Sequence, residues 1–155
     1  MGIVTSYERL TSMRREIAAK NYEQALQTGR DEIERGHESS DLLLLMATAG
    51  QLSEGDSCSL DDVRGWLERA TQLSPDNAEA WMELGHFLDA VADQPQLATS
   101  AFENALRRSL DILATALDGL ESTELSHDEA TRERVNSLRR RAATLLGLPS
   151  GGSGG

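Results

Sequence analysis

Residues 70–105 constrain the fold of this 155-residue chain more than any other segment, because they carry the apolar pattern of two packed helices. On the first of these helices, Trp81, Leu84 and Leu88 recur about one turn apart and share one face. Gly85 lies beside this stripe and removes a side chain where a second helix must approach closely. The second helix has a matching stripe, formed by Ala98, Phe102 and Ala105. The pattern predicts a helical hairpin and contains no catalytic group.

The composition extends this prediction to the whole chain. Leu, Ala, Glu and Arg are abundant, and only six residues are aromatic, so Leu and Ala must carry most of the packing. The three prolines, Pro75, Pro95 and Pro149, fall where helices are expected to start or end. A chain of this length is expected to form one domain with a sizeable core. We therefore expect an all-α fold.

Capping signals and chain breakers predict about seven helices. Helix starts are marked by Ser or Thr residues, most of them followed three residues later by a carboxylate, at Thr5 (with Glu8) or Ser6, Ser39 or Ser40, Ser59 with Asp62, and Ser126 with Glu129. Gly36 ends the second helix and Gly147 ends the last. Residues 42–49 are apolar nearly all round, which predicts a buried third helix, and a loop is expected over residues 51–57.

The sixth helix is expected to be long. No chain breaker occurs between Pro95 and Gly119, and small or apolar residues continue at spacings of three or four throughout this stretch. A break at residues 107–109 is the alternative, because a helical turn would fall there if the repeat pattern continued. We expect one continuous helix.

Small residues recur at equivalent places in successive helical pairs. Ala25, Val63 and Ala98 are 38 and 35 residues apart, and a period near 34 residues indicates an α-solenoid. The chain resembles the tetratricopeptide repeat (TPR) family. Its third repeat matches the family pattern at Trp81, Leu84, Gly85, Leu88, Ala98, Phe102 and Ala105. Its second repeat matches the pattern at Leu43, Met46, Ala47, Leu67, Ala70 and Pro75.

The resemblance covers residues 6–109, and its first repeat departs most from the pattern. Gly29 and Glu32 occupy the places of a large and a small packing residue. The resemblance implies a right-handed α-solenoid of about three antiparallel helix pairs, followed by capping helices. We expect residues 1–148 to form a single TPR-like domain and the Gly/Ser-rich residues 149–155 to be a flexible linker or tag remnant.

Charge and segment patterns limit the partners and the location. The formal net charge of −11, with an isoelectric point near 4.6, opposes nucleic acid and an anionic membrane surface. No apolar run approaches the length of a membrane span, and no presequence is recognisable. Cys58 is the only cysteine, and we expect it to be an unreactive surface thiol. These observations predict a cytoplasmic protein that binds neither nucleic acid nor membrane.

The sequence contains no recognisable catalytic or cofactor motif. His37, His86 and His127 are far apart, and none pairs with a carboxylate at the spacing of a helical metal site. A phosphate-binding loop, a nucleophile elbow and paired cysteines are all missing. We expect no enzymatic activity, no cofactor and no metal, and we retain an enzyme using His86 with Glu83 or Asp89 only as a remote alternative.

The resemblance implies a peptide-binding groove, because the first helix of each pair lines a concave surface in this family. Its outward positions correspond here to Asp41, Leu44 and Thr48 in the second repeat and to Glu79, Met82, Glu83, His86 and Asp89 in the third. Such an acidic surface with Leu and Met suits a basic, or a mixed basic and apolar, peptide or helix of another protein. A solvated helix face is the equally simple alternative.

One binding mode of the family is disfavoured here. The family's capture of acidic C-termini requires Lys, Arg and Asn in the groove, whereas Leu44, Leu45, Glu79, Met82 and Glu83 stand there, so that mode is disfavoured.

Two further interpretations remain open. The terminal helices could instead build a homo- or hetero-oligomer, which would make the protein a structural subunit. The run Arg139, Arg140 and Arg141 either complements the end of a helix or docks an acidic partner. The favoured function is a non-enzymatic interaction module, such as an adaptor, a small chaperone or a neutralising partner.

Overall fold

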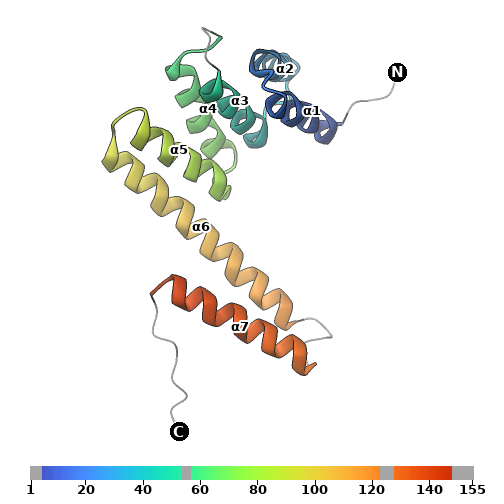
Figure 1. Ribbon diagram of the computed structural model, residues 1–155, viewed down its shortest axis with the longest axis vertical. Helices are drawn as coiled ribbons and strands as arrows, with labels where there is room; N and C mark the ends of the chain where they lie inside the picture. Colours follow the sequence, from blue (N-terminus) through green and yellow to red (C-terminus); the bar gives the residue numbers. More distant parts are fainter. Residues whose placement is uncertain (1–4, 54–56, 123–127, 148–155) are drawn as a thin grey trace. The chain divides into compact units, whose positions relative to one another are not determined.

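The computed structural model describes residues 5–53, 57–122 and 128–147, and these residues form seven helices and no strand (Figure 1). The prediction of an all-α fold with about seven helices is therefore confirmed. Residues 1–108 and residues 109–155 form two compact units. The single domain expected over residues 1–148 and the handedness of the solenoid stay predictions.

The first unit consists of consecutive helices that pack against their neighbours. It contains α1 (Ser6–Ala18), α2 (Tyr22–Glu34), α3 (Ser40–Leu52), α4 (Leu60–Leu73), α5 (Ala78–Ala90) and the first part of α6 (Pro95–Glu121). Each helix from α1 to α4 contacts the next one, and α3 also contacts both α1 and α5. Helices α1, α3 and α5 thus lie next to one another, which is compatible with stacked helical pairs.

Side-chain caps fix the starts of these helices. The Thr5 hydroxyl accepts a hydrogen bond from the Glu8 amide while the Glu8 carboxylate accepts one from the Thr5 amide at 2.7 Å, which confirms the first capping box. Ser59 and Asp62 form the second one at the start of α4. Ser39 caps α3, since its hydroxyl accepts from the Leu42 amide.

Two helix boundaries differ from the predictions. The loop expected from residue 51 begins later, because α3 continues through Leu52 and the Ser53 amide still donates to the Ala49 carbonyl. Gly50 does not end this helix, since its bare Cα faces Cys58 and Val63 instead of solvent. Asp128 is the N-cap of α7, and the predicted cap Ser126 lies outside the described residues.

The sixth helix is continuous. It runs over 27 residues from Pro95 to Glu121, so the prediction of one long helix is confirmed and the alternative break at residues 107–109 is wrong. Pro95 opens it, which suits a residue that has a fixed φ and no amide hydrogen to donate. The helix contributes residues to both units.

Helix α3 is the centre of the core of the first unit. Its sequence is apolar nearly all round, and six of its apolar side chains are buried, at Leu42, Leu43, Leu44, Met46, Ala47 and Ala49. Met13 of α1, Leu26 of α2 and Leu67 of α4 are fully buried in the same core. The predicted burial of this helix is confirmed, because a helix packed on several sides has no face left for polar residues.

The second unit contains the remainder of α6 and α7 (Glu129–Leu145). Thr131 and Val135 are the buried residues of α7. Leu138 and Leu145 remain exposed, Leu145 to 87% of its surface. Helix α7 therefore exposes large apolar side chains to solvent, whereas α3 buries most of its apolar side chains.

Candidate functional site

The first unit contains a pocket of about 250 Å³ on the side formed by α1, α3 and α5, which we call the groove pocket. Its lining residues come from three helices: Arg14 of α1, Asp41, Leu44, Leu45 and Thr48 of α3, and Glu79 and Glu83 of α5. The pocket exists because α3 contacts both α1 and α5 and lies between them.

The structure brings together five of the eight residues predicted to line a groove, namely Asp41, Leu44, Thr48, Glu79 and Glu83. The other three, Met82, His86 and Asp89, are exposed on α5 and do not line this pocket. On a helix, residues three or four apart are neighbours, so Met82 and His86 lie beside Glu79 and Glu83 on α5, although only the two glutamates line the pocket. The ring of His86 packs edge-on against Phe102, with 5.1 Å between the ring centroids.

Sequence reasoning missed one lining residue, Arg14, and placed Leu45 in the groove without counting it among the eight predicted binding residues. The repeat period would have identified Arg14. Arg14 precedes Thr48 by 34 residues and Thr48 precedes Glu83 by 35, so the three occupy equivalent positions of the expected repeats. The weak match of the first repeat to the family pattern hid this correspondence.

The groove pocket is acidic and has an apolar floor. Three carboxylates, those of Asp41, Glu79 and Glu83, face one guanidinium, that of Arg14. These four groups form no ion pair with any described residue. Leu44 is only 7% exposed and provides the floor.

The polar groups of this pocket mostly accept hydrogen bonds. The Thr48 hydroxyl already donates to the Leu44 carbonyl at 2.9 Å, so its oxygen is left as an acceptor. Carboxylates at neutral pH are acceptors only. The arrangement therefore suits a ligand that carries several donors, such as an ammonium or a guanidinium group.

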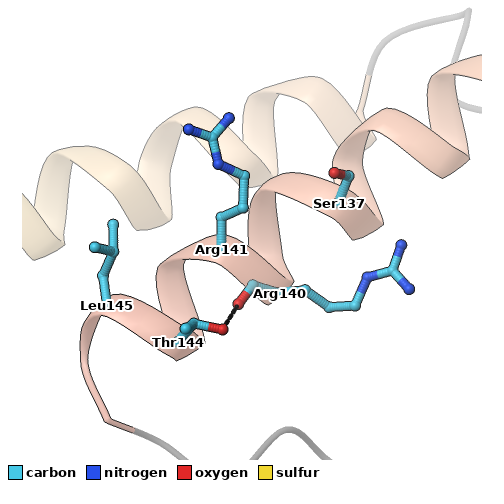
Figure 2. Close-up of a pocket in the computed structure, with 5 residues that line it drawn as sticks. All are labelled: Ser137, Arg140, Arg141, Thr144 and Leu145. Carbon is cyan, nitrogen blue, oxygen red and sulfur yellow. Dashed lines mark hydrogen bonds between the residues drawn. The ribbon is translucent and has the colours of Figure 1, made fainter.

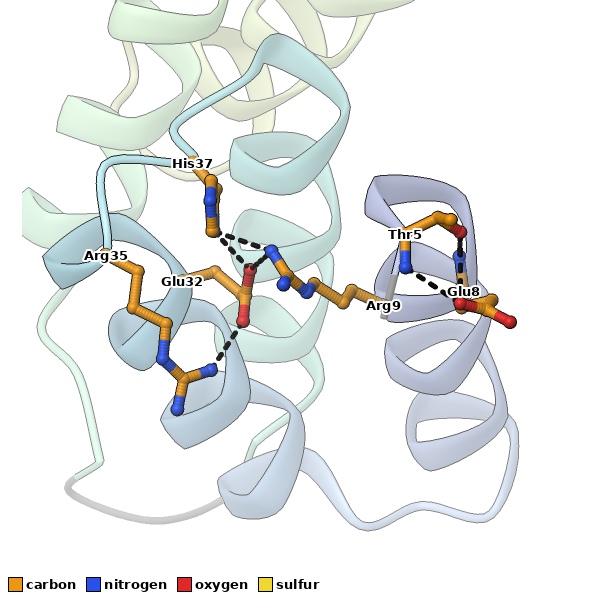
Figure 3. Close-up of polar contacts among 6 residues, drawn as sticks. All are labelled: Thr5, Glu8, Arg9, Glu32, Arg35 and His37. Carbon is orange, nitrogen blue, oxygen red and sulfur yellow. Dashed lines mark hydrogen bonds and ion pairs between the residues drawn. The ribbon is translucent and has the colours of Figure 1, made fainter. Parts of the chain in front are cut away.

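A second polar cluster connects α1 to α2 and to the residues that follow α2 (Figure 3). Glu32 of α2 is buried, and one of its carboxylate oxygens lies 2.6 Å from Nη1 of Arg9 and 3.0 Å from Nδ1 of His37. The other oxygen lies 2.8 Å from Nη1 of Arg35. This cluster fastens α1 to α2 and to the turn that follows α2, and we read it as structural, since every polar oxygen of Glu32 is occupied.

The partners of Glu32 also set its ionisation. Burial by itself raises the pKa of the Glu32 carboxyl, but the hydrogen bonds from His37 and Arg35 and the charge of Arg9 outweigh this effect and hold the pKa below its ordinary value. The group is consequently a fixed anion at neutral pH. A carboxylate in this state is a poor general acid, which agrees with a structural role.

Cys58 is half-buried against the core, so the expectation of a surface thiol is wrong. A Cβ placed on Gly50 would lie 2.8 Å from its sulfur, which shows how closely α3 approaches it. Burial raises the pKa of the Cys58 thiol, the charge of Asp62 adds to the increase, and Arg30 opposes it. A raised pKa keeps the thiol protonated and slows its reaction as a nucleophile.

The described residues contain neither a cluster of metal-ligand type nor a membrane-spanning helix. Within residues 5–53, 57–122 and 128–147, no group of three or more His, Cys, Asp and Glu side chains is arranged as metal ligands would be. No helix in these same ranges combines the length and the apolarity that crossing a membrane requires.

Comparison with known proteins gives no further assignment. The chain matches no protein-family model, and it has no significant match among curated proteins or among solved structures. The resemblance to the TPR family accordingly stays a prediction, and the function has to be argued from the groove pocket itself.

Proposed function

We propose that this protein is a non-enzymatic interaction module that holds a basic, or a mixed basic and apolar, segment of another protein in the groove pocket. The observation that supports this most is the convergence of Asp41, Glu79 and Glu83 around Leu44, from two different helices. An adaptor, a small chaperone and a neutralising partner would all use such a surface. TPR-like repeats and a cytoplasmic location belong to the same proposal.

The chemistry of the pocket defines the ligand. A guanidinium or ammonium group of the bound segment donates hydrogen bonds to the carboxylates of Glu79 and Glu83, which lie four residues apart on one face of α5. An adjacent apolar side chain contacts Leu44 and Leu45. Charge complementarity of this kind selects the partner and speeds association more than it adds affinity.

The same pocket discriminates against acidic segments. An incoming carboxylate meets three negative charges, and Arg14 is the only cation in the lining. Like charges brought together at an interface are unfavourable, so this repulsion provides specificity. Arg14 instead suits a backbone carbonyl or a single acidic group at one end of an otherwise basic ligand.

The test is a binding titration with two labelled probe peptides, one of alternating arginine and leucine and one of alternating glutamate and leucine. We expect the parent protein to bind only the first peptide. The double variant Glu79→Arg, Glu83→Arg should lose this binding by about tenfold or more, because attraction becomes repulsion. Met82→Arg is the matched control, since Met82 is exposed on the same helix but does not line the pocket.

Two outcomes would contradict the proposal. Equal affinity of the parent for both peptides would show that the charge of the groove does not select the ligand. Equal loss of binding in Met82→Arg and in the Glu79, Glu83 double variant would show that the ligand recognises the general charge of α5 and not the pocket.

A further inference from the structure

The C-terminal half of α7 is the most basic part of the chain. Residues 137–145 contain three arginines and no acidic residue, although the whole protein carries a net charge of −11. One side of this segment, which we call the arginine face, borders a pocket of about 470 Å³ and consists of Ser137, Arg140, Arg141, Thr144 and Leu145 (Figure 2).

The two cations of the arginine face are available to an external partner. Figure 2 shows the side chains of Arg140 and Arg141 projecting from α7, and both residues are exposed. Neither forms an ion pair with a described residue. The Thr144 hydroxyl donates to the Arg140 carbonyl at 2.9 Å, so it does not occupy either guanidinium group.

Apolar surface accompanies this charge. Leu145 is the most exposed of the large apolar side chains described, and Leu138, about two turns earlier on α7, is also exposed. Solvent-exposed leucines next to unpaired arginines are the mixed basic and apolar surface that the groove pocket suits. The chain therefore contains both complementary surfaces, one in each of its two units.

We propose that the groove pocket of one copy of this chain binds the arginine face of α7 of a second copy. Arg140 and Arg141 then pair with Asp41, Glu79 and Glu83, and Leu145 contacts the apolar floor at Leu44. The two surfaces differ, so the contact is heterologous and generates either closed assemblies or open chains. This inference rests on the groove pocket of the proposed function and names a second copy as its occupant.

The test is a charge exchange in the 155-residue chain, followed by sedimentation across a range of protein concentrations. The parent should self-associate, and raised ionic strength should weaken the assembly because the surfaces are solvent-exposed. The groove variant Glu79→Arg, Glu83→Arg and the α7 variant Arg140→Glu, Arg141→Glu should each weaken it by about tenfold or more. Combining all four substitutions in one chain should restore it, because the charges are exchanged and not removed.

Mixing the variants provides an independent readout. The unaltered α7 of the groove variant fits the unaltered groove of the α7 variant, so an equimolar mixture should associate although neither variant does alone. Glu103→Arg and Arg107→Glu are the matched controls, since both residues are exposed on α6 and line neither pocket. A parent that is monomeric at every concentration overturns the inference, as does a four-substitution chain that fails to regain assembly while remaining folded.

The peptide titration separates this inference from the proposed function. If the arginine and leucine peptide binds the groove and the parent remains monomeric, the inference alone fails. If the chain self-associates through both surfaces and the groove ignores the peptide, capture of a foreign segment fails and the inference stands. When both hold, Arg140→Glu, Arg141→Glu should bind the peptide more tightly than the parent does at concentrations where the parent associates, because its groove is unoccupied.

Discussion

Gly85 lets the ring of Phe102 pack directly against the backbone of α5. A Cβ added to this glycine would lie 2.7 Å from Cε1 of Phe102 and 2.8 Å from Cδ1, well inside van der Waals contact. The same ring also makes a T-shaped contact with His86, the next residue of α5. The contact explains why a glycine stands in the middle of a helix, where it would otherwise be unfavourable.

We expect Gly85→Ala to lower the free energy of unfolding by about 1–3 kcal/mol, because the ring or the helix must move to admit the methyl group. The matched control is Gly65→Ala in α4, where an added Cβ meets no atom within 4 Å. That substitution should stabilise the protein by about 0.5–1 kcal/mol through helix propensity alone. Denaturant unfolding measures both, and equal effects of the two substitutions would contradict the packing argument.

Glu32 shows how a residue that departs from the repeat pattern is accommodated. The pattern has a small packing residue at its place, yet the longer side chain is buried with its charge matched by Arg9, Arg35 and His37 (Figure 3). Gly29, which replaces a large packing residue, is compensated in a similar way, because the side chain of Met46 fills the space beside it. Neither compensation is visible in sequence, since the partners lie in other helices and in the turn after α2.

The ion pairs of Glu32 predict a pH dependence of stability. At neutral pH, Glu32→Gln should cost about 2–3 kcal/mol, because charge-assisted hydrogen bonds are lost. The folded-state pKa of Glu32 lies below its ordinary value, so its stabilising contribution is complete above about pH 4.3 and is lost as the pH falls through the lower, folded-state pKa. The difference in unfolding free energy between parent and variant should therefore shrink in acid.

Thermal or urea unfolding from pH 7 to pH 3 measures this difference. Glu34→Gln is the matched control, because Glu34 is an exposed neighbour on the same helix. It should change stability by less than about 0.5 kcal/mol at any of these pH values. If the difference in unfolding free energy between parent and Glu32→Gln grew as the pH fell, the pKa of Glu32 would have to be raised in the folded state and not lowered.

At the scale of the elements, the starts of the helices were the most predictable feature. Thr5 with Glu8 and Ser59 with Asp62 are local signals, since each capping box closes within four consecutive residues. The length of α6 was predictable for a similar reason, because no breaker interrupts it. The extent of α3 was not, since Gly50 stays helical through contacts with Cys58 and Val63, which follow it in the chain.

The capping box of α4 yields a prediction for a single hydroxyl. Ser59→Ala removes the acceptor of the Asp62 amide hydrogen and one donor to the Asp62 carboxylate, and should cost about 1 kcal/mol of stability. Ser12→Ala, at an exposed position inside α1, should stay within about 0.5 kcal/mol of the parent. Denaturant unfolding at neutral pH compares the two, and a loss of the same size in both would show that the cap does not stabilise α4.

At the scale of the whole molecule, the class of fold was predictable because periodicity and composition agree along the chain. The groove was predictable only in part. Asp41, Leu44, Thr48, Glu79 and Glu83 follow from the expected second and third repeats, of which the third matches the TPR pattern best. Arg14 belongs to the expected repeat that matches the pattern worst, and the packing of the helices decides which exposed residues of α5 line the pocket.

The charges are unevenly distributed along the chain, so one acidic protein carries surfaces of opposite charge. Acidic residues prevail in the first unit, at the groove pocket, whereas the last turns of α7 carry only arginines as charged groups. Cations near a helix C-terminus also complement the helix dipole, so this placement stabilises α7 whether or not a partner binds. The self-association test in the charge-exchanged chain distinguishes these two contributions, since only binding responds to the groove substitutions.

In the proposed function, a basic and apolar segment binds between α1, α3 and α5. The most direct measurement is an NMR titration of the isotope-labelled protein, kept dilute, with the arginine and leucine peptide. We predict that backbone signals shift mainly at Arg14, Asp41, Leu44, Glu79 and Glu83 and their neighbours, and that Glu79→Arg, Glu83→Arg abolishes these shifts. Shifts confined to α2, α4 or α7, or shifts that persist unchanged in the double variant, would contradict the claim.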